Sequence, residues 1–538
     1  MTERGKFIKG TIILICANAI AKILGAVFKI PLTYILKEEG MAVYQTAFSV
    51  YMVFLPFVTS GFPFAVTKLL AEYHALGRED RVRPVVNSTC KILLTVGIFS
   101  SAVMYLFATQ FALSMRETNA DGAIRAISLS VAIVSIGSVI KSSNEARSDL
   151  LPTAFSQVSE SAVKLFCGLY LASRLISISV FKAADGAIFS VTVGEAFATS
   201  LLLIVWRFRV RKLPDGKASK SELKSIFSVA IPLLLTGLAT GLLGMAEVSV
   251  TRNALSSITF SPGEAIHFLR KYSAYTNVFD SLPKVLTLTS EGARKLYGAF
   301  SGYAQTVFNL PVGIIATVSA AATPMFASAL SLGNNKNTVK TAERVLSLIF
   351  SLAVPSAALC YFFSGNILYL LFGNRFSSDM LQCISPALIF IAASNMYISL
   401  LHLSGKIFEP FVIVSAGLII KIIFSAILIR IPDLNILGAA IAGCISSCLI
   451  FLALSYQFRK SFGAYIHIFR IIAVPFAASC IMVGVISPFN AALSVYINEK
   501  AAFLASCFLG AVGYLLTTIL LHKNNSFTIT LGSKKMQS

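Results

Sequence analysis

The chain has 538 residues, of which 56% are hydrophobic and only 13% are charged. Soluble domains carry about 25% charged residues, so this composition excludes a soluble globular protein. Lysine and arginine number 45 against 24 aspartates and glutamates, for a net charge of +21. Combined with this hydropathy, the basic excess indicates contact with an anionic membrane surface and argues against a nucleic-acid-binding protein.

The nine cysteines lie within or beside apolar stretches and form no Cys-x-x-Cys pairs. That distribution predicts neither a disulfide framework nor a zinc site. The sequence also lacks a nucleotide-binding phosphate loop and the His-Glu-x-x-His metalloprotease motif. We therefore predict no catalytic residues, no metal site and no cofactor, and transport driven by ATP on this chain is not expected.

A hydrocarbon core about 30 Å thick requires about 20 apolar residues per helix. An open sheet cannot satisfy its edge hydrogen bonds in lipid, so each apolar run is read as a helix. We predict an all-α integral membrane protein with fourteen transmembrane helices, at residues 9–36, 42–72, 85–110, 122–143, 150–173, 186–206, 224–251, 297–330, 343–372, 380–404, 409–431, 435–457, 466–488 and 501–521.

The basic residues between these runs gather on one side of the predicted membrane, beginning with Arg4, Lys6 and Lys9. Positive residues mark the cytoplasmic side of a membrane protein, so both termini are predicted to be cytoplasmic in a bacterial plasma membrane. The first run is too long, and carries too many lysines, for a cleaved signal peptide. We expect it to be an uncleaved spanning helix.

A faint internal repeat supports a division into two related halves. Pro56 precedes Gly77 by 21 residues, and Pro311 precedes Gly333 by 22 residues, in similar apolar surroundings. Because both copies would cross the membrane in the same direction, a site between two lobes is expected. The predicted divisions are two pseudo-symmetric six-helix lobes at 1–206 and 224–457, a basic cytoplasmic linker at 207–223, an outer loop at 252–296, two C-terminal helices within 458–521 and a tail at 522–538.

Two connections leave alternatives open. The basic stretch after residue 206 suits either an interfacial helix lying on anionic lipid or a solvated linker. The outer loop contains amphipathic stretches such as Ala265–Tyr275, which suit either a lid or an ordinary structured loop.

Several motifs resemble the stage V sporulation protein B family of polysaccharide-type exporters. They are Lys-Gly-Thr at 9–11, Ala-Lys-Ile-Leu-Gly at 21–25, Lys-Ile-Pro at 29–31, Glu-Gly-Met-Ala-Val-Tyr-Gln at 39–45, Ser-Gly-Phe-Pro at 60–63, Lys-Leu-Leu-Ala-Glu at 68–72, Leu-Tyr-Gly-Ala-Phe-Ser-Gly-Tyr-Ala at 296–304 and Asn-Leu-Pro at 309–311. The resemblance places the chain in the superfamily of lipid II flippases and multidrug and toxin extruders. It implies two six-helix lobes plus, in the lipid-flipping branch, two further helices that we take as the polyprenyl groove.

The resemblance implies that the chain flips a polyprenyl-pyrophosphate-linked sugar, first of all lipid II, to the outer leaflet. Charged groups in lipid cost several kcal/mol, so a hydrated cationic cavity is expected. Lys22 and Lys29 lie seven residues apart on one helix face and form a cationic stripe, with Gly25 on the same side leaving room for a close approach. The resemblance implies that basic residues of this helix are required.

Other cations are candidates at the ends of the predicted helices. Lys68 lies near a cytoplasmic end, where anchoring in the interface is the alternative, and Arg252 and Arg294 lie where an outer mouth is expected. We predict substrate binding by Lys22, Lys29, Lys68, Gly25, Arg252 and Arg294. The resemblance also implies an acid and an arginine after Tyr303 and Ala304, and this chain has Gln305 and Thr306 instead.

Acidic residues inside the apolar runs are the candidates for ion coupling. Glu247 follows Gly237, Gly241 and Gly244, which permit tight helix approach, and could bind Na⁺, carry a proton or form a static ion pair. Glu195 is the second candidate, whereas Glu160 and Lys164 stand one turn apart and suit a local pair.

The function predicted from the sequence is an alternating-access flippase whose partners are a polyprenyl-linked saccharide and the bilayer, with cell-wall synthesis proteins as further partners and no nucleic acid. Coupling to Na⁺, to H⁺ or to neither is left open. The alternatives are an exporter of another lipid-linked polysaccharide unit, such as a teichoic or capsule precursor, and a multidrug or organic-cation antiporter. An antiporter of that kind is expected to centre its cavity on carboxylates, and the lysine stripe argues against it.

Overall fold

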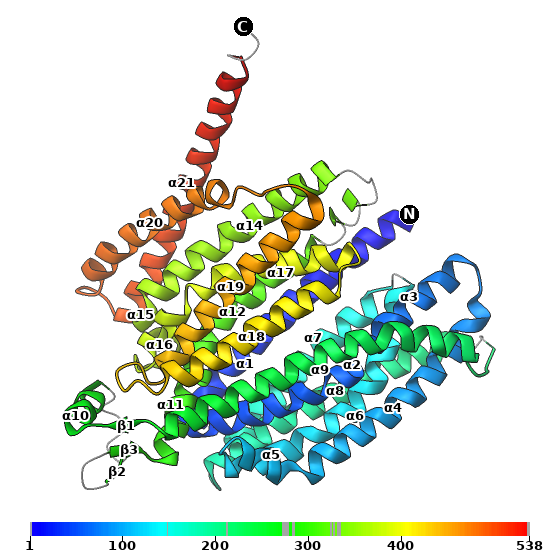
Figure 1. Cartoon of the computed structure of the whole chain (residues 1–538), viewed down its shortest axis with the longest axis horizontal. Coiled ribbons are helices and arrows are strands. Elements are labelled where there is room, and N and C mark those ends of the chain that lie inside the picture. Colours follow the sequence, from blue (N-terminus) through cyan, green and yellow to red (C-terminus); the bar gives the residue numbers. More distant parts are fainter. Residues whose placement is uncertain are drawn as a thin grey trace. The chain divides into compact units, whose positions relative to one another are not determined.

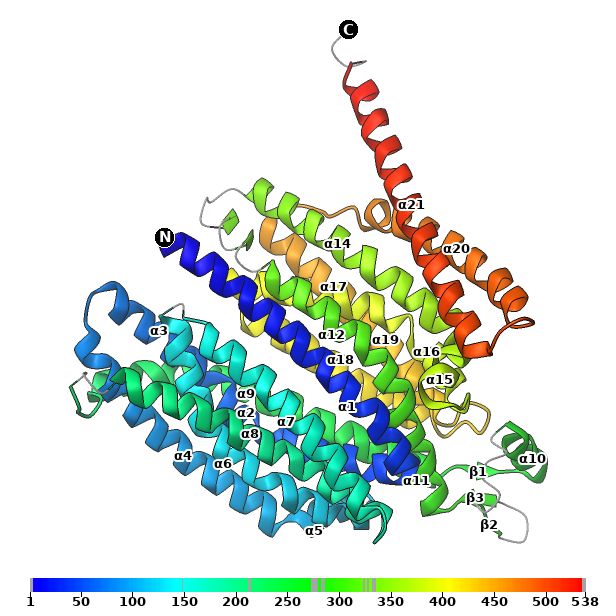
Figure 2. The same cartoon turned by 180° about the vertical axis from the view of Figure 1, so that it is seen from behind.

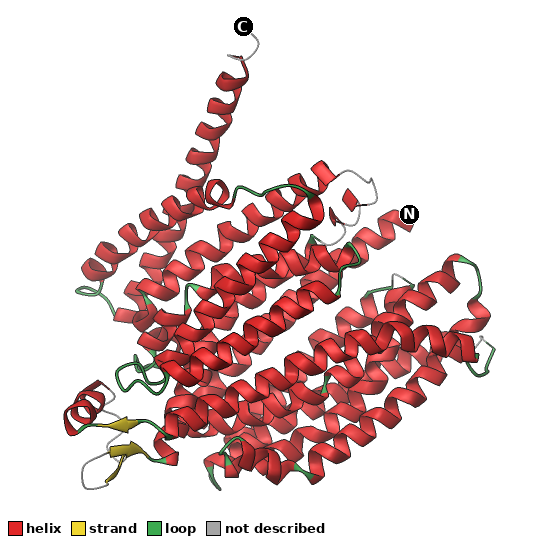
Figure 3. Ribbon diagram, viewed as in Figure 1, coloured by secondary structure: helices red, strands yellow, loops and turns green. Residues whose placement is uncertain are grey.

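The computed structural model describes residues 3–147, 149–210, 214–271, 279–281, 286–322, 325–326, 329–330 and 335–534. These residues are almost all helical, apart from one small sheet (Figure 3). They form two compact units. Unit 1 comprises Met1–Thr306 and Leu418–Ala442, and unit 2 comprises Val307–Gly417 and Gly443–Ser538.

Unit 1 contains the helices from α1 to α11 and the small sheet (Figure 1). Its elements, apart from the part of α18 and α19 within Leu418–Ala442, are α1 (Glu3–Phe54), α2 (Pro56–Thr59), α3 (Gly61–Ala75), η1 (Glu79–Arg81), α4 (Val82–Leu106), α5 (Ala108–Ser114), η2 (Thr118–Ala120), α6 (Asp121–Ala146), α7 (Leu151–Leu175), α8 (Val180–Val210), α9 (Lys220–Ser256), β1 (Thr259–Phe260), α10 (Pro262–Lys271), β2 (Phe279–Ser281), β3 (Leu286–Leu288), α11 (Ser290–Ala299) and the π-helix η3 (Phe300–Ala304).

Unit 2 is made of the remaining helices. They are α12 (Gln305–Ala321), α14 (Asn335–Phe362), α15 (Ser364–Phe372), α16 (Ser378–Ile384), α17 (Ala387–Leu403), α18 (Phe408–Leu428), α19 (Leu437–Phe462), α20 (Ile468–Leu493) and α21 (Glu499–Lys534). Within this unit α14 packs against α17 and α20, and α20 packs against α21. The hydroxyl of Tyr514 on α21 donates a hydrogen bond of 2.8 Å to the Ser351 carbonyl on α14.

The chain is a multi-pass membrane protein, but the predicted number of fourteen spans is not confirmed. Among the described residues, ten helices are long and apolar enough to cross a membrane, or eleven if α16 and α17, bent by 41°, form one span. Two predicted runs merge because α1 continues through a kink at Lys37, which has φ 51°. The run at 150–173 contains charged Glu160 and Lys164, and the run at 297–330 is broken by η3.

Small residues set the spacing of the helices in unit 1. A Cβ on Gly61 of α3 would lie 1.9 Å from the Ala230 carbonyl oxygen of α9. Gly237 and Gly241 of α9 similarly face Pro56 of α2 at 2.6 Å and the Met52 carbonyl of α1 at 2.5 Å. Only glycine permits such backbone approach. The tight approach predicted for this glycine series is confirmed at Gly237 and Gly241, whereas Gly244 faces open space.

Other helices of unit 1 form a layer in which α6 packs against α4 and α8, and α7 packs against α8. α1 lies beside α7 (Figure 2). A large apolar core that includes Phe28, Tyr44, Ile127 and Ile188 joins these helices. The burial of this core fixes the position of α1, which carries part of the site described below.

The structure describes part of each of these two connections. In the described part of 207–223, residues 207–210 continue α8 and residues 214–219 are non-helical before α9 begins at Lys220. Ser219 and Glu222 form a reciprocal capping box there, which fixes the start of α9. The described part of 252–296 contains the end of α9, then α10, α11 and an antiparallel sheet of order β1-β3-β2. The predicted lobe boundaries and the internal repeat stay predictions.

Candidate functional site

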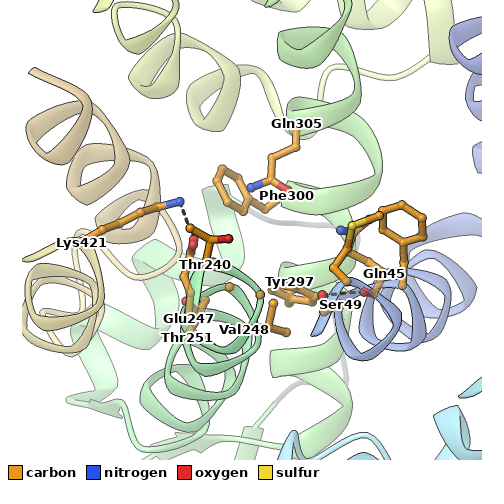
Figure 4. Close-up of a pocket in the computed structure, with 14 residues that line it drawn as sticks. Gln45, Ser49, Thr240, Glu247, Val248, Thr251, Tyr297, Phe300, Gln305 and Lys421 are labelled. Carbon is orange, nitrogen blue, oxygen red and sulfur yellow. Dashed lines mark hydrogen bonds and ion pairs between the residues drawn. The ribbon is translucent and has the colours of Figure 1, made fainter. Parts of the chain in front are cut away.

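A cavity of about 240 Å³ lies within unit 1, between α1, α9, the segment from α11 to the start of α12, and α18 (Figure 4). Its walls carry a cation, a carboxylate, two amides and several hydroxyls. The polar side chains that line it are Gln45 and Ser49 of α1, Thr240, Glu247 and Thr251 of α9, Tyr297, Gln305 and Lys421. Polar groups of this kind on apolar helices are the usual mark of a pathway through a membrane protein.

The charges of the cavity form one ion pair. Lys421 Nζ of α18 lies 2.6 Å from Glu247 Oε1 of α9, and each side chain is about one-fifth exposed, at 20% and 19%. Figure 4 shows the two side chains reaching toward each other from separate helices. The ion-pair alternative stated for Glu247 is therefore present in this conformation. Its partner, Lys421, lies much later in the sequence, on α18.

Two motif segments that are far apart in the sequence meet beside this cavity. A Cβ on Gly298 would lie 1.8 Å from the Glu38 carbonyl oxygen, and a Cβ on Gly302 would lie 2.9 Å from Met41 Cβ. Tyr303 donates a 3.1 Å hydrogen bond to Glu38. The segments 39–45 and 296–304, which carried the family resemblance, thus form one packed unit that supplies Gln45, Tyr297 and Phe300 to the cavity.

Arg252 and Arg294 both bind Glu117, in the turn between α5 and η2. Arg252 Nη2 lies 2.6 Å from Glu117 Oε2, and Arg294 Nε lies 2.9 Å from Glu117 Oε1. Glu117 is fully buried and Arg252 is only 2% exposed. The Arg252 guanidinium also lies 5.8 Å from the centroid of the Tyr297 ring, which lines the cavity. In this conformation Glu117 pairs with both arginines, which leaves a net positive charge on the cluster, and it ties α9 and α11 to the α5–η2 turn.

The lysine stripe lies on α1, outside the cavity lining. Lys22 is exposed and Lys29 is half-buried, within electrostatic range of Lys164 on α7. A Cβ on Gly25 would meet no atom within 4 Å, so this glycine leaves open space between the lysines instead of a helix contact. Lys68 is exposed on α3. The structure does not bring these four residues together with Glu247.

A second charged cluster lies inside the helices of unit 1. Glu195 of α8 is within hydrogen-bonding contact of Glu160 on α7, and Glu160 Oε2 lies 3.8 Å from Lys141 Nζ on α6. Lys164 instead lies near the rings of Phe28 and Phe48, at 5.6 and 5.9 Å from their centroids. The local pair predicted between Glu160 and Lys164 is thus replaced by a pair with Lys141. No group of three metal-ligating side chains occurs in the described residues.

Part of the site was not predicted from the sequence. Lys421 was visible as a lysine within an apolar run, but nothing in the sequence marked α18 as the neighbour of α9. Gln45 ends one motif that carries the resemblance, and Gln305 stands where the resemblance implies an acid, so each amide was an available signal. Glu117 gave no signal, because it lies in a short turn between helices.

Comparison with known proteins places this architecture in a family. Residues 7–330 match the model described as polysaccharide biosynthesis protein. The chain belongs to this family. Residues 297–511 of this family member also match the model described as lipid II flippase MurJ.

Two curated relatives from Bacillus subtilis (strain 168) resemble this polysaccharide biosynthesis protein along most of its length. Lipid II flippase MurJ is 24% identical over 467 residues, which cover 81% of this chain and 79% of that protein. Stage V sporulation protein B is 22% identical over 446 residues, which cover 81% of this chain and 80% of that protein. The predicted membership of the exporter superfamily is therefore confirmed.

Solved structures share the fold of this family member. A lipid II flippase MurJ in an inward closed conformation has a TM-score of 0.64 at 15% identity and covers 95% of this chain and 99% of that one. An inward-facing multidrug resistance MATE family transporter of the MOP superfamily has a TM-score of 0.65 at 13% identity. The match covers 84% of this chain and 98% of that one. The MurJ relative and these two solved structures are themselves described as flippases or as a transporter.

Proposed function

We propose that this protein flips a polyprenyl-pyrophosphate-linked sugar from the inner to the outer leaflet by alternating access, with lipid II as the first substrate to test. The observation that carries the proposal is the cavity in which Lys421 and Glu247 lie among amides and hydroxyls of α1, α9 and the segment from α11 to the start of α12. Lys421 offers a point charge to a diphosphate, and the amides and hydroxyls offer hydrogen bonds to a sugar.

The size of the cavity has a consequence for the transport cycle. At about 240 Å³ it is smaller than the roughly 300–1,000 Å³ of pockets that enclose drug-sized ligands. A complete saccharide-diphosphate headgroup therefore requires a wider state. In that state the diphosphate would compete with Glu247 for Lys421, so that substrate binding and release of the ion pair are linked.

We place the lysine stripe on the entry path of the same substrate. Lys22 and Lys29 lie on α1, which also carries Gln45 and Ser49 of the cavity beyond the kink at Lys37. The open space beside Gly25 leaves room for a headgroup. Lys68 is a further candidate on α3. Arg252 and Arg294 become available to the substrate only when Glu117 releases them.

We propose Glu195 as the first candidate for ion coupling and Glu247 as the second. Two carboxyl groups in contact, such as Glu195 and Glu160, repel each other unless a proton or a cation lies between them. Glu247 already has a cationic partner in Lys421. An inside-negative potential also favours outward movement of an anionic headgroup by about 2.3 kcal/mol per charge per 100 mV. Imposing a Na⁺ gradient, a H⁺ gradient and a membrane potential in separate experiments shows which of them drives flipping.

The proposal is tested by reconstituting the full chain in proteoliposomes with fluorescent lipid II, a fluorescent teichoic-type polyprenyl lipid or a fluorescent organic cation. Flipping of lipid II that exceeds that of the second lipid at least about tenfold, or about 1.4 kcal/mol, supports lipid II. If the teichoic-type lipid is flipped faster than lipid II, the protein is still a flippase but its substrate is a different lipid-linked unit. Transport of the organic cation alone, by monodisperse protein, overturns the proposal.

A further inference from the structure

A second and larger cavity, of about 930 Å³, lies on unit 1 at the end where α8 finishes and α4 begins. Its polar wall is formed by Arg83 and Asn87 of α4 and by Arg207 of α8. None of these residues lines the cavity that contains Glu247. The feature is therefore separate from the proposed transport site.

The charge of this cavity is positive. Arg207 is exposed, and no ion pair of its side chain occurs within the part of the chain that the structure describes. Arg83 lies 3.3 Å from Asp215 Oδ2, and Asn87 donates a hydrogen bond of 3.2 Å to the other oxygen of Asp215. The Asp215 carboxylate is 65% exposed. Arg83 and Arg207 thus contribute two positive charges against the one negative charge of Asp215, which leaves an excess of one positive charge.

The remaining wall is apolar and continues along α8. Leu203, Ile204 and Phe208 line the cavity with exposed fractions of 40%, 53% and 75%. On a membrane-spanning helix such side chains face acyl chains, whereas arginine and aromatic residues gather at the interface with water. The cavity therefore joins an anion-binding end to a surface suited to hydrocarbon.

We propose that this cavity binds an anionic glycerophospholipid from the surrounding leaflet. Its phosphate lies between Arg83 and Arg207, where guanidinium groups form paired hydrogen bonds to phosphate oxygens. Its acyl chains lie along Leu203, Ile204 and Phe208. A free phosphate would leave the apolar wall unused, so charge complementarity and this wall together select a lipid. The site does not depend on the proposed flipping activity.

The chain contains its own reporter for this test. Trp206 is the single tryptophan in the sequence, and it lines the cavity. Bromine atoms on a lipid quench tryptophan emission only at short range. The full chain is placed in nanodiscs of zwitterionic phosphatidylcholine, and brominated phosphatidylglycerol or brominated phosphatidylcholine is added in increasing proportion. The proposal predicts that phosphatidylglycerol reaches half-maximal quenching at a much lower mole fraction.

Variants identify the groups responsible. Each of Arg83→Gln and Arg207→Gln is expected to weaken the preference for phosphatidylglycerol about fivefold, which corresponds to about 1 kcal/mol per basic residue near an anionic surface. Arg207→Lys retains most of the preference. Arg125→Gln is the matched control, because Arg125 stacks on Tyr105 near the opposite end of α4. That variant is expected to leave quenching unchanged.

Three results would overturn the proposal. Equal quenching by the two brominated lipids excludes selection for an anionic lipid. An unchanged preference in monodisperse Arg83→Gln and Arg207→Gln proteins excludes these guanidinium groups. Displacement of brominated phosphatidylglycerol by undecaprenyl diphosphate at a lower mole fraction than by unlabelled phosphatidylglycerol assigns the cavity to the polyprenyl lipid instead.

Discussion

The ammonium nitrogen of Lys421 lies 2.6 Å from a carboxylate oxygen of Glu247, and both side chains line one cavity. A partly buried pair of this kind is costly to break on one side, because the remaining charge is left without a partner. The pair therefore stabilises the present conformation and at the same time holds the lysine that we propose to bind diphosphate.

The first prediction separates these two roles of the pair. Glu247→Gln and Lys421→Gln each lower the free energy of unfolding by about 3 kcal/mol, because one charge is left unpaired. The exchanged variant, Glu247→Lys with Lys421→Glu, restores much of the thermal stability. It is not expected to restore flipping, since the cation then lies on α9. Recovery of both stability and flipping would show that the pair is only structural.

A second prediction concerns the buried carboxylate Glu117. Glu117→Gln removes the partner of Arg252, which is 2% exposed, and lowers the free energy of unfolding by about 3–5 kcal/mol. Arg294→Gln costs less, because Arg294 is 14% exposed and Glu117 keeps its bond to Arg252. Thermal unfolding in detergent measures which of the two variants loses more stability. Equal losses in the two variants would contradict the central position of Glu117.

A third prediction tests the contact between the two motif segments. Gly298→Ala places a Cβ 1.8 Å from the Glu38 carbonyl oxygen, so α11 must move away from α1. We expect a loss of at least about 1–3 kcal/mol in unfolding free energy, as for other overpacked sites. Gly244→Ala is the control, since its Cβ meets nothing within 4 Å. A monodisperse Gly298→Ala protein with unchanged melting temperature would count against the packing described here.

A fourth prediction concerns pH at the start of α11. A hydrogen bond from Lys295, together with its charge, lowers the pKa of Glu291 below its ordinary value of 4.5. Because the pKa is lower in the folded state, the stabilisation is present above pH 4.5 and is lost as the pH falls through the lowered value. Amide exchange at the start of α11 should accelerate over that acidic range. Glu291→Gln should remove this acceleration, and its persistence in the variant would refute the assignment.

A fifth prediction concerns the coupling cluster. Glu195→Gln leaves Glu160 with Lys141 and removes the contact between two carboxyl groups. If a proton or cation enters between them, the variant loses the dependence of flipping on the imposed gradient while keeping flipping that is driven by the potential. Glu145→Gln on α6 is the control at a neighbouring acid. A gradient response that is identical in native and Glu195→Gln protein removes Glu195 from the coupling role.

The membrane-spanning helices were predictable from the sequence, because a long apolar run between charged residues is stable in lipid only as a helix. Glu247 was also identified, since an acid after three glycines in an apolar helix demands a partner. The count of spans was less predictable. Glu160 and Lys164 lower the hydropathy of α7, and α1 continues through the kink at Lys37 although Lys37, Glu38 and Glu39 form a polar break between the two runs.

The partners of the charges could not be predicted, because they depend on tertiary packing. Lys421 and Glu247 are separated by most of the second half of the chain, and no local pattern connects them. Glu160 on α7 pairs with Lys141 on α6 and not with Lys164 on its own helix. Arg252 and Arg294, predicted to face the substrate, instead share Glu117 from a short turn.

The central claim is that the cavity around Lys421 moves a lipid-linked sugar. Its most direct test is the initial rate of fluorescent lipid II flipping in proteoliposomes for native, Lys421→Gln and Lys421→Arg proteins at equal reconstitution. A hydrogen bond to a charged group contributes about 1.5–3 kcal/mol, so Lys421→Gln should slow flipping about tenfold or more and Lys421→Arg should retain most of it. Equal rates in native and Lys421→Gln proteins would contradict the claim.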